Sequence, residues 1–270
     1  GCHMDGVGPR RAMSSRQVAA FEKAFRGEAK PLFAQALDGS LPACIRSVAW
    51  RFFLGVLPST PPETWESHLA TARARYLHLV GEHCTDPHEA SSRLEDASIA
   101  NPLSQHEASP WEKYFSSQEL RSDIDKDLAR LHPGFDFFAD SEIVAAMRRV
   151  LLVWSLEHSQ LSYRQGMHEL LAPFIHVAVT EAAEADAARP AATTTAPGSS
   201  RAVLSAVLSP EFAEADAYAL FDQLMVHASG WFESSAAAAA HDSGGGAAGG
   251  GSRGEDAPAW HIHVANPSPD

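Results

Sequence analysis

Cysteine is scarce in this chain of 270 residues, which contains three, Cys2, Cys44 and Cys84, and no CxxC pair. An odd and widely spaced set predicts free thiols in a reducing compartment and excludes a disulfide-stapled fold. The chain also lacks any run of about 18 apolar residues, so we expect no membrane-spanning helix and no direct insertion into a membrane. These absences indicate a cytoplasmic protein.

Basic residues are also scarce, because 21 lysines and arginines face 34 acidic residues and leave a net charge of -13. Residues 181–270 hold only 3 of the basic residues but 12 of the acidic ones. Duplex nucleic acid would be repelled by this charge and would find no basic stripe to bind. Any phosphate chemistry must therefore depend on single, locally placed cations.

The sequence contains no phosphate-binding loop of its own. Neither GxxxxGKS/T nor GxGxxG occurs, and the glycines near residue 245 lack both the lysine and the preceding strand that such a loop needs. A GxSxG nucleophile elbow is absent as well. We therefore expect no nucleotide site, no cofactor and no hydrolase centre within the chain.

Metal-ligand spacing is equally weak. The nearest candidates crowd into one short segment: His78, His83, Cys84 and His88. Zinc binds four converging ligands, commonly as two close pairs on separate elements, so we interpret these side chains as solvated residues near a helix end. His261 and His263 are weaker candidates still, and no metal is predicted.

Apolar residues recur at spacings of three and four through most of the first 180 residues, and convincing strand alternation is absent. The stripe from Ile143 to Trp154 is the clearest case. Thr64 is expected to cap a helix that begins at Trp65, and Pro173 should kink the helix that follows Gln165. The predicted fold class is all-α.

The composition divides the chain into segments. We leave residues 1–13 out of the fold, because GCHM is interpreted as a remnant of an expression vector. A helical domain is expected over residues 14–180. It is expected to continue over 203–234, where Ser209 and Pro210 begin the last clear helix. Residues 181–202 and 235–270 are too rich in Ala, Thr, Pro and Gly to form a core, so they are expected to be flexible insertions or tail. Residues 84–110 form a polar stretch with a turn signal at Asn101-Pro102.

Two short segments carry the candidate chemistry, IDKDLAR at residues 124–130 and YRQG at residues 163–166. On the helix of Ile124, Arg130 lies about 120° from the apolar stripe and should point out of the core. Asp127 is three residues earlier and can accept a hydrogen bond from the guanidinium. Taken alone, Arg130 fits an ordinary surface ion pair and Gln165 fits a residue at a helix N-terminus.

Together, a planar cation and a neutral amide at helix ends are what GTP hydrolysis in trans requires. An inserted arginine stabilises the charge of the transferring γ-phosphoryl group more in the transition state than in the ground state. A glutamine can hold the attacking water with its carbonyl while its NH2 group donates a hydrogen bond. Elsewhere, Arg46 and Trp50 are four residues apart on one helix, which allows the guanidinium to stack on the indole, first of all as a stabilising contact.

These motifs resemble the TBC-domain family, the GTPase-activating proteins of Rab small GTPases. Ile124, Asp127 and Arg130 match its IxxDxxR motif, and Tyr163, Gln165 and Gly166 match its YxQG motif. RSVAWRFFLG at residues 46–55 is similar to the family's opening helix with Arg46 and Trp50, and the segment from Asn101 to Arg130 resembles the member-five subgroup. The likeness covers residues 41 to 176 and is weaker over 209–232.

The resemblance implies an all-helical domain that inserts two side chains, an arginine finger (Arg130) and a glutamine finger (Gln165), into the nucleotide site of a GTP-bound Rab. The GTP and Mg²⁺ of the Rab would be the only cofactors. It gives Arg130 the role of charge stabiliser and Gln165 that of water positioner. Asp127 would orient the arginine, and Tyr163 and Gly166 would shape the glutamine loop. The chain would itself be an activator, recruited peripherally to endomembranes for vesicle trafficking, and not an enzyme.

The resemblance leaves a departure and two alternatives. A second helical half, which TBC domains have, is not found after Trp231, so we expect this chain to hold the N-terminal, finger-bearing part of the domain. One alternative is a TBC-like scaffold that binds a Rab or a trafficking complex without accelerating hydrolysis. The other is an unrelated helical interaction domain, which would show no nucleotide-dependent Rab binding.

Overall fold

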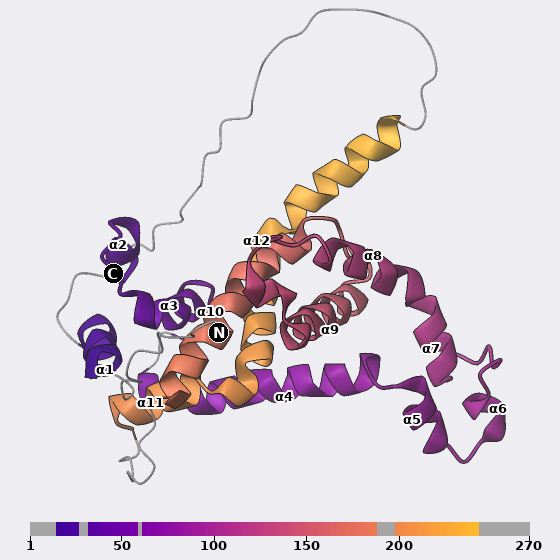
Figure 1. Cartoon of the computed structure of the whole chain (residues 1–270), viewed down its shortest axis with the longest axis horizontal. Helices are drawn as coiled ribbons and strands as arrows, with labels where there is room; N and C mark the ends of the chain where they lie inside the picture. Colours follow the sequence, from indigo (N-terminus) through magenta and orange to yellow (C-terminus); the bar gives the residue numbers. More distant parts are fainter. Residues whose placement is uncertain (1–14, 27–31, 59–60, 188–197, 243–270) are drawn as a thin grey trace, which may run out of the picture. The chain divides into compact units, whose positions relative to one another are not determined.

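The computed structural model describes residues 15–26, 32–58, 61–187 and 198–242 (Figure 1). These residues form helices and turns and contain no strand, which confirms the predicted all-α class. The elements before the arginine motif are α1 (Ser15–Phe21), the π-helix η1 (Glu22–Arg26), α2 (Leu32–Leu37), η2 (Ala43–Ile45), α3 (Arg46–Phe53), η3 (Pro62–Thr64), α4 (Trp65–His83), α5 (Pro87–Ser92), α6 (Ala97–Ala100) and α7 (Pro110–Ser116). The remaining elements are α8 (Gln118–Leu128), η4 (Asp136–Ala139), α9 (Ser141–Glu157), α10 (Met167–Ala187), α11 (Ser200–Val207), η5 (Pro210–Phe212) and α12 (Ala213–Asp242).

The chain divides into two units, residues 1–233 and residues 234–270. The first unit holds every helix from α1 to α11 and most of α12. In the second unit, the structure describes only the last part of α12, from Ser234 to Asp242.

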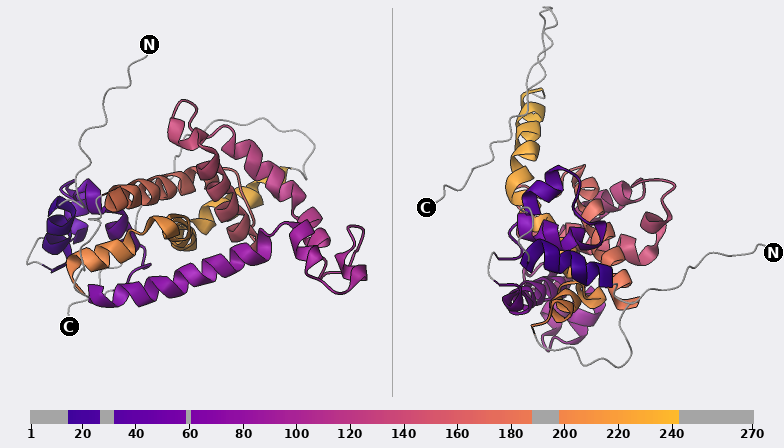
Figure 2. Two further views of the ribbon diagram at one scale, coloured as in Figure 1. Left: turned by 60° about the horizontal axis from the view of Figure 1, so that its bottom comes forward. Right: turned by 90° about the vertical axis from the view of Figure 1, so that its left-hand side faces the viewer.

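Helix α9 is the central element of the first unit and contacts α4, α8 and α10 (Figure 2). Asp140 caps its N-terminus, because the carboxylate accepts hydrogen bonds from the backbone N–H groups of Glu142 and Ile143. The predicted stripe then faces the core, and Val150 and Trp154 are almost completely buried. Helix α9 packs against α8, which carries the first motif, and it leads into the loop of the second motif, so it helps to fix where the two candidate loops lie.

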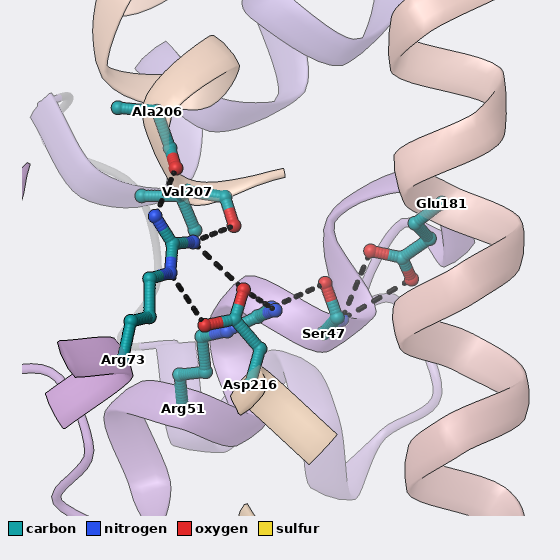
Figure 3. A network of polar contacts seen from close by, with 7 residues as sticks. All are labelled: Ser47, Arg51, Arg73, Glu181, Ala206, Val207 and Asp216. Atoms are coloured by element: carbon teal, nitrogen blue, oxygen red, sulfur yellow. Dashed lines mark hydrogen bonds and ion pairs between the residues drawn. The ribbon is translucent and has the colours of Figure 1, made fainter. Parts of the chain in front are cut away.

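A buried ion cluster joins helices that are far apart in the sequence (Figure 3). Asp216 on α12 binds Arg51 of α3 at 3.0 Å and Arg73 of α4 at 2.7 Å, and all three side chains are buried. Arg73 also donates to the carbonyl groups of Ala206 and Val207 at the end of α11. Buried charges are tolerated only when they are paired and hydrogen-bonded, so these contacts fix the packing of α3, α4, α11 and α12.

A second buried carboxylate caps a helix from outside that helix. Both oxygens of Glu181 on α10 accept from the backbone N–H of Ser47, in the first turn of α3, at 3.1 Å (Figure 3). The N-terminal N–H groups of a helix have no partner within the helix, and a carboxylate there is favoured by the helix dipole. Burial raises the pKa of the Glu181 carboxyl, and the bonds from Ser47 oppose that rise.

Several expected boundaries differ from the structure. The polar stretch 84–110 contains two short helices that were not predicted, α5 and α6, capped by Asp86 and Asp96. The turn at Asn101-Pro102 is confirmed, since the N–H of Ser104 donates to the Asn101 carbonyl at 2.9 Å. Thr64 does precede α4 but makes no side-chain cap, because its hydroxyl donates to the Pro61 carbonyl.

The expected insertion over residues 181–202 is also shorter in the structure. Helix α10 continues to Ala187, with Pro173 inside it, and Ala182 and Ala185 are buried. Helix α11 begins at Ser200. The expected lead (1–13) and the histidines at 261 and 263 lie outside the described residues, and the tail expected over 235–270 is helical as far as Asp242.

Candidate functional site

Arg130 lies in the turn that directly follows α8. The helix ends at Leu128, and the N–H of Arg130 donates to the carbonyl of Asp127 at 3.3 Å. Ile124, one helical turn before Asp127, is completely buried and anchors this end of α8. The Arg130 side chain is 56% exposed, so it points out of the core as the helical pattern predicts.

Asp127 links this turn to the second motif. Its side chain is only 10% exposed, and its Oδ1 accepts a hydrogen bond from Nη2 of Arg130 at 2.5 Å. Its Oδ2 accepts from the hydroxyl of Tyr163 at 2.7 Å. One carboxylate therefore accepts a hydrogen bond from each of the two loops, through a different oxygen in each case.

The second motif lies in a tight loop between α9 and α10. Ser162 and Gly166 adopt positive φ values of 53° and 100°, and the N–H of Met167 donates to the carbonyl of Arg164 at 3.1 Å. Gln165 is exposed at the mouth of α10. A Cβ atom added at Gly166 would meet only Phe232, at 3.9 Å, so the φ value and not the available space requires glycine here.

The contacts of Asp127 bring the two loops together. Tyr163 is two residues before Gln165, and Asp127 is three residues before Arg130. The bond between Tyr163 and Asp127 therefore holds the exposed arginine and the exposed glutamine on neighbouring turns. Neither tip is buried in the interior, which would have made a role at a partner's phosphate impossible.

His168 is a buried member of this site that the motif analysis missed. Its Nδ1 lies 2.9 Å from the Tyr163 hydroxyl and 3.4 Å from Oδ2 of Asp127, and its side chain is 3% exposed. Burial lowers the pKa of His168, and Asp127 opposes this shift. Burial, followed by the hydrogen bond to Asp127, raises the pKa of Tyr163, so the phenol stays protonated as a donor.

Arg46 and Trp50 do not form the stacked pair that their spacing allows. Arg46 is exposed, and the Trp50 ring instead packs edge-on against Phe174 of α10, with centroids 5.6 Å apart. The cation–π contacts found among the described residues are formed by Arg73 and by Arg121. Trp50 thus helps to hold α3 against the helix that follows the glutamine loop.

The other candidates for metal binding have different partners. Nε2 of His83 lies 2.9 Å from a carboxylate oxygen of Glu157, and the ring of His88 packs edge-on against Trp111. Within the part of the chain that the structure describes, no group of three or more His, Cys, Asp or Glu side chains is arranged to hold a metal ion.

An apolar hollow of about 650 Å³ opens beside the arginine turn. The segment after Arg130, from His132 to Phe138, forms one wall, and Ala172, Pro173 and His176 of α10 form the other. The aromatic rings of Phe135 and Phe137 pack edge-on against His176. The recessed surface is therefore formed by segments that follow the two candidate loops in the chain.

The all-helical fold is consistent with a TBC domain, and the chain belongs to the Rab-GTPase-TBC domain family, whose sequence profile matches residues 43–238. TBC1 domain family member 5 of Mus musculus is 39% identical over 207 residues, which are 74% of this chain and 24% of that protein. The Homo sapiens protein of the same name is 37% identical over 207 residues, again 74% of this chain and 24% of its own length. TBC1 domain family member 5 homolog B of Dictyostelium discoideum is 35% identical over 188 residues, 70% of this chain and 17% of that protein.

These relatives agree with the predicted likeness to the member-five subgroup, and the match spans about a quarter of their length or less. Comparison with solved structures found no match. Among the described helices, none has both the length and the apolar composition that crossing a membrane requires.

Proposed function

We propose that this chain accelerates GTP hydrolysis by a Rab-type GTPase in its GTP-bound state, with Arg130 and Gln165 inserted in trans at the partner's nucleotide. The observation that carries the proposal is the shared carboxylate of Asp127, which joins the arginine turn to the glutamine loop while both finger side chains stay exposed. The membership of the chain in the Rab-GTPase-TBC family supports the same assignment.

Arg130 would stabilise the negative charge of the transferring phosphoryl group. A guanidinium carries five N–H donors, and Asp127 engages Nη2, so donors remain that can face phosphate oxygens. The contact with Asp127 limits the directions in which the half-exposed side chain can point. A finger whose aim is already restricted loses less conformational entropy when it binds.

Gln165 would position the attacking water in place of the GTPase's own glutamine. Gly166 provides the positive φ that turns the chain into α10, and Tyr163 ties the loop to α8. Ile124 supports the arginine turn from within the core, and Trp50 supports α10 through Phe174. Arg46, although exposed, belongs to the same opening helix.

The chain would contribute no nucleotide site of its own, so GTP and Mg²⁺ would belong to the Rab. We further propose that it works in the cytoplasm, recruited peripherally to endomembranes, in vesicle trafficking. The acidic net charge of -13 argues against nucleic acid as an additional partner.

The test is a single-turnover assay of phosphate release from a panel of purified, GTP-loaded Rab proteins with and without the chain. Arg130→Ala, Arg130→Lys and Gln165→Ala should each abolish stimulation while folding is unchanged. A finger of this kind contributes about 10³- to 10⁵-fold in rate. Arg93→Ala is the matched control, because Arg93 is an exposed arginine in an ordinary helical ion pair with Glu89.

The scaffold alternative predicts a different outcome of the same screen. A non-catalytic TBC-like module would bind a Rab in a nucleotide-dependent manner without any change in its hydrolysis rate. Near wild-type stimulation by both Arg130 variants would show that the finger assignment is wrong.

A further inference from the structure

His168 is buried beside the two loops and has a defined place in their hydrogen bonds. Its Nδ1 is 2.9 Å from the Tyr163 hydroxyl, which in turn is 2.7 Å from Asp127. The contacts run in order from His168 through Tyr163 and Asp127 to Arg130. Only the last of these side chains is largely exposed.

Counting protons fixes the direction of these bonds. A phenol has a single hydrogen, and an ionised carboxylate can only accept, so the Tyr163 hydroxyl donates to Asp127. The phenol oxygen is then free to accept, and Nδ1 of His168 must carry the hydrogen that it receives. A neutral imidazole has one N–H, so Nε2 of His168 is unprotonated.

This arrangement divides the oxygens of Asp127 between the loops. Oδ2 accepts a hydrogen bond from the phenol, and Oδ1 accepts one from Nη2 of Arg130. Had Nδ1 of His168 been unprotonated, it would have competed with Asp127 for the single phenol hydrogen. The tautomer of His168 therefore decides whether the Tyr163 hydroxyl donates its hydrogen to Asp127 or to His168.

We propose that His168 is a positioning residue for both fingers, an inference that rests on the proposed function. It holds the Tyr163 hydroxyl on Asp127, and this keeps the Arg130 turn and the Gln165 loop in one fixed relation. His168 does not reach the phosphate itself, because it is buried, and it acts through Tyr163 and Asp127.

The charged surroundings of His168 give the inference a pH signature. Asp127 and Arg130 face it from the end of α8, His132 from the turn beyond, and Glu169 from α10. Burial lowers the pKa of His168, so it stays neutral through the ordinary histidine range and protonates only in more acidic solution. Once charged, it would attract the Asp127 carboxylate and repel Arg130, which weakens the aim of the finger.

Two substitutions separate positioning from packing. His168→Leu fills the site but removes the donor, whereas His168→Asn keeps an N–H close to the place of Nδ1 and cannot titrate. On the most strongly stimulated Rab of the panel, His168→Leu should lower kcat about 10- to 100-fold with little change in KM, because small misplacements of catalytic groups cost this much. His168→Asn should stay within about threefold of wild type at neutral pH.

The pH dependence of stimulation is a readout that a purely structural role of His168 would not change. The ratio of wild-type to His168→Asn stimulation cancels the pH dependence of the GTPase, and it should fall in acidic solution. His83→Asn is the matched control, because His83 also pairs with a carboxylate, but with Glu157 and not with Asp127. Its ratio to wild type should be constant with pH.

A measurement without any Rab keeps this inference distinct from the proposed function. In ¹⁵N NMR spectra of the whole chain, His168 should carry its hydrogen on Nδ1, and His168→Leu should make the Arg130 side chain more mobile. If the wild-type chain stimulates no Rab, the proposed function fails, and the NMR result still decides how the loops are held. The inference alone is overturned if stimulation is normal in His168→Leu, if His168→Asn is no better than His168→Leu, or if the hydrogen lies on Nε2.

Discussion

Asp127→Asn tests the connection between the two loops most directly. Asparagine has the shape of aspartate, but it offers one acceptor oxygen and one NH2 donor in place of two acceptors. With its oxygen toward Tyr163, its NH2 group faces Nη2 of Arg130, and two donors then oppose each other. With its oxygen toward Arg130, its NH2 group faces the phenol. In the first orientation the bond to Arg130 is lost. In the second the amide can only donate to the phenol oxygen, so the bond donated by Tyr163 is lost, and the carboxylate charge is missing in both.

The size of the effect follows from the burial of each partner. A hydrogen bond to a charged group contributes about 1.5–3 kcal/mol, and the Tyr163 bond lies on a carboxylate that is only 10% exposed. The pair with Arg130 is discounted to at most about 1 kcal/mol, since that side chain is 56% exposed. We expect the free energy of unfolding to fall by about 1.5–3 kcal/mol, which for a unit of this size lowers Tm by roughly 3–12 °C. Stimulation of the Rab should fall about 10- to 100-fold.

Thermal unfolding followed by circular dichroism measures the first quantity, and single-turnover phosphate release measures the second. Asp123→Asn is the control, because Asp123 makes an i,i+3 ion pair on the same helix, with Lys126, in which both side chains are exposed. It should unfold at the wild-type temperature. The reasoning is refuted if Asp127→Asn also melts with wild type and stimulates the Rab at the wild-type rate.

Three further substitutions test the packing that supports the site. Asp216→Asn leaves Arg51 and Arg73 without their shared carboxylate, so urea denaturation should show a loss of about 3–5 kcal/mol. Gly166→Ala forces a side chain into a φ of 100° and should cost about 1–3 kcal/mol and lower stimulation, whereas Gly81→Ala within α4 should leave the urea midpoint unchanged or raise it. Glu181 has a raised pKa in the folded state, so the native protein binds its proton more tightly than the unfolded chain does. The stability of wild type relative to Glu181→Gln should therefore rise as pH falls through that pKa toward the ordinary value of 4.5, and an opposite trend in urea midpoints would contradict the assignment.

Features set within a single helix could be predicted from the sequence. The periodic stripe from Ile143 to Trp154 gave α9, because helical geometry alone places residues three and four apart on one face. The same geometry placed Arg130 outside the core and Asp127 within its reach. The overlooked helices α5 and α6 had good local signals in Asp86 and Asp96 as N-caps, but too few apolar residues to show a period.

Features that depend on packing between helices could not be predicted. The end of α10 was expected to be flexible because of its alanine-rich composition, yet Ala182 and Ala185 are buried against neighbouring helices. Small side chains lack a strong hydrophobic signal but allow helices to approach closely. The bond between Tyr163 and Asp127 spans 36 residues, so no local pattern announces it. His168 is missed as well, because its role depends on the bond from its neighbour Tyr163 to Asp127 on another helix.

Burial separates the residues of the candidate site into two groups with different consequences. Arg130 and Gln165 are exposed, so their replacement removes few folded-state contacts, and a loss of stimulation there reports chemistry at the partner's nucleotide. Asp127 and His168 are buried, so their replacement must change stability and loop position together. A variant of either that lost stability but kept wild-type stimulation would mean that the hydrogen bonds between the loops do not orient the fingers. Measuring unfolding and stimulation for variants of these four residues therefore distinguishes side chains that reach the GTPase from side chains that only orient them.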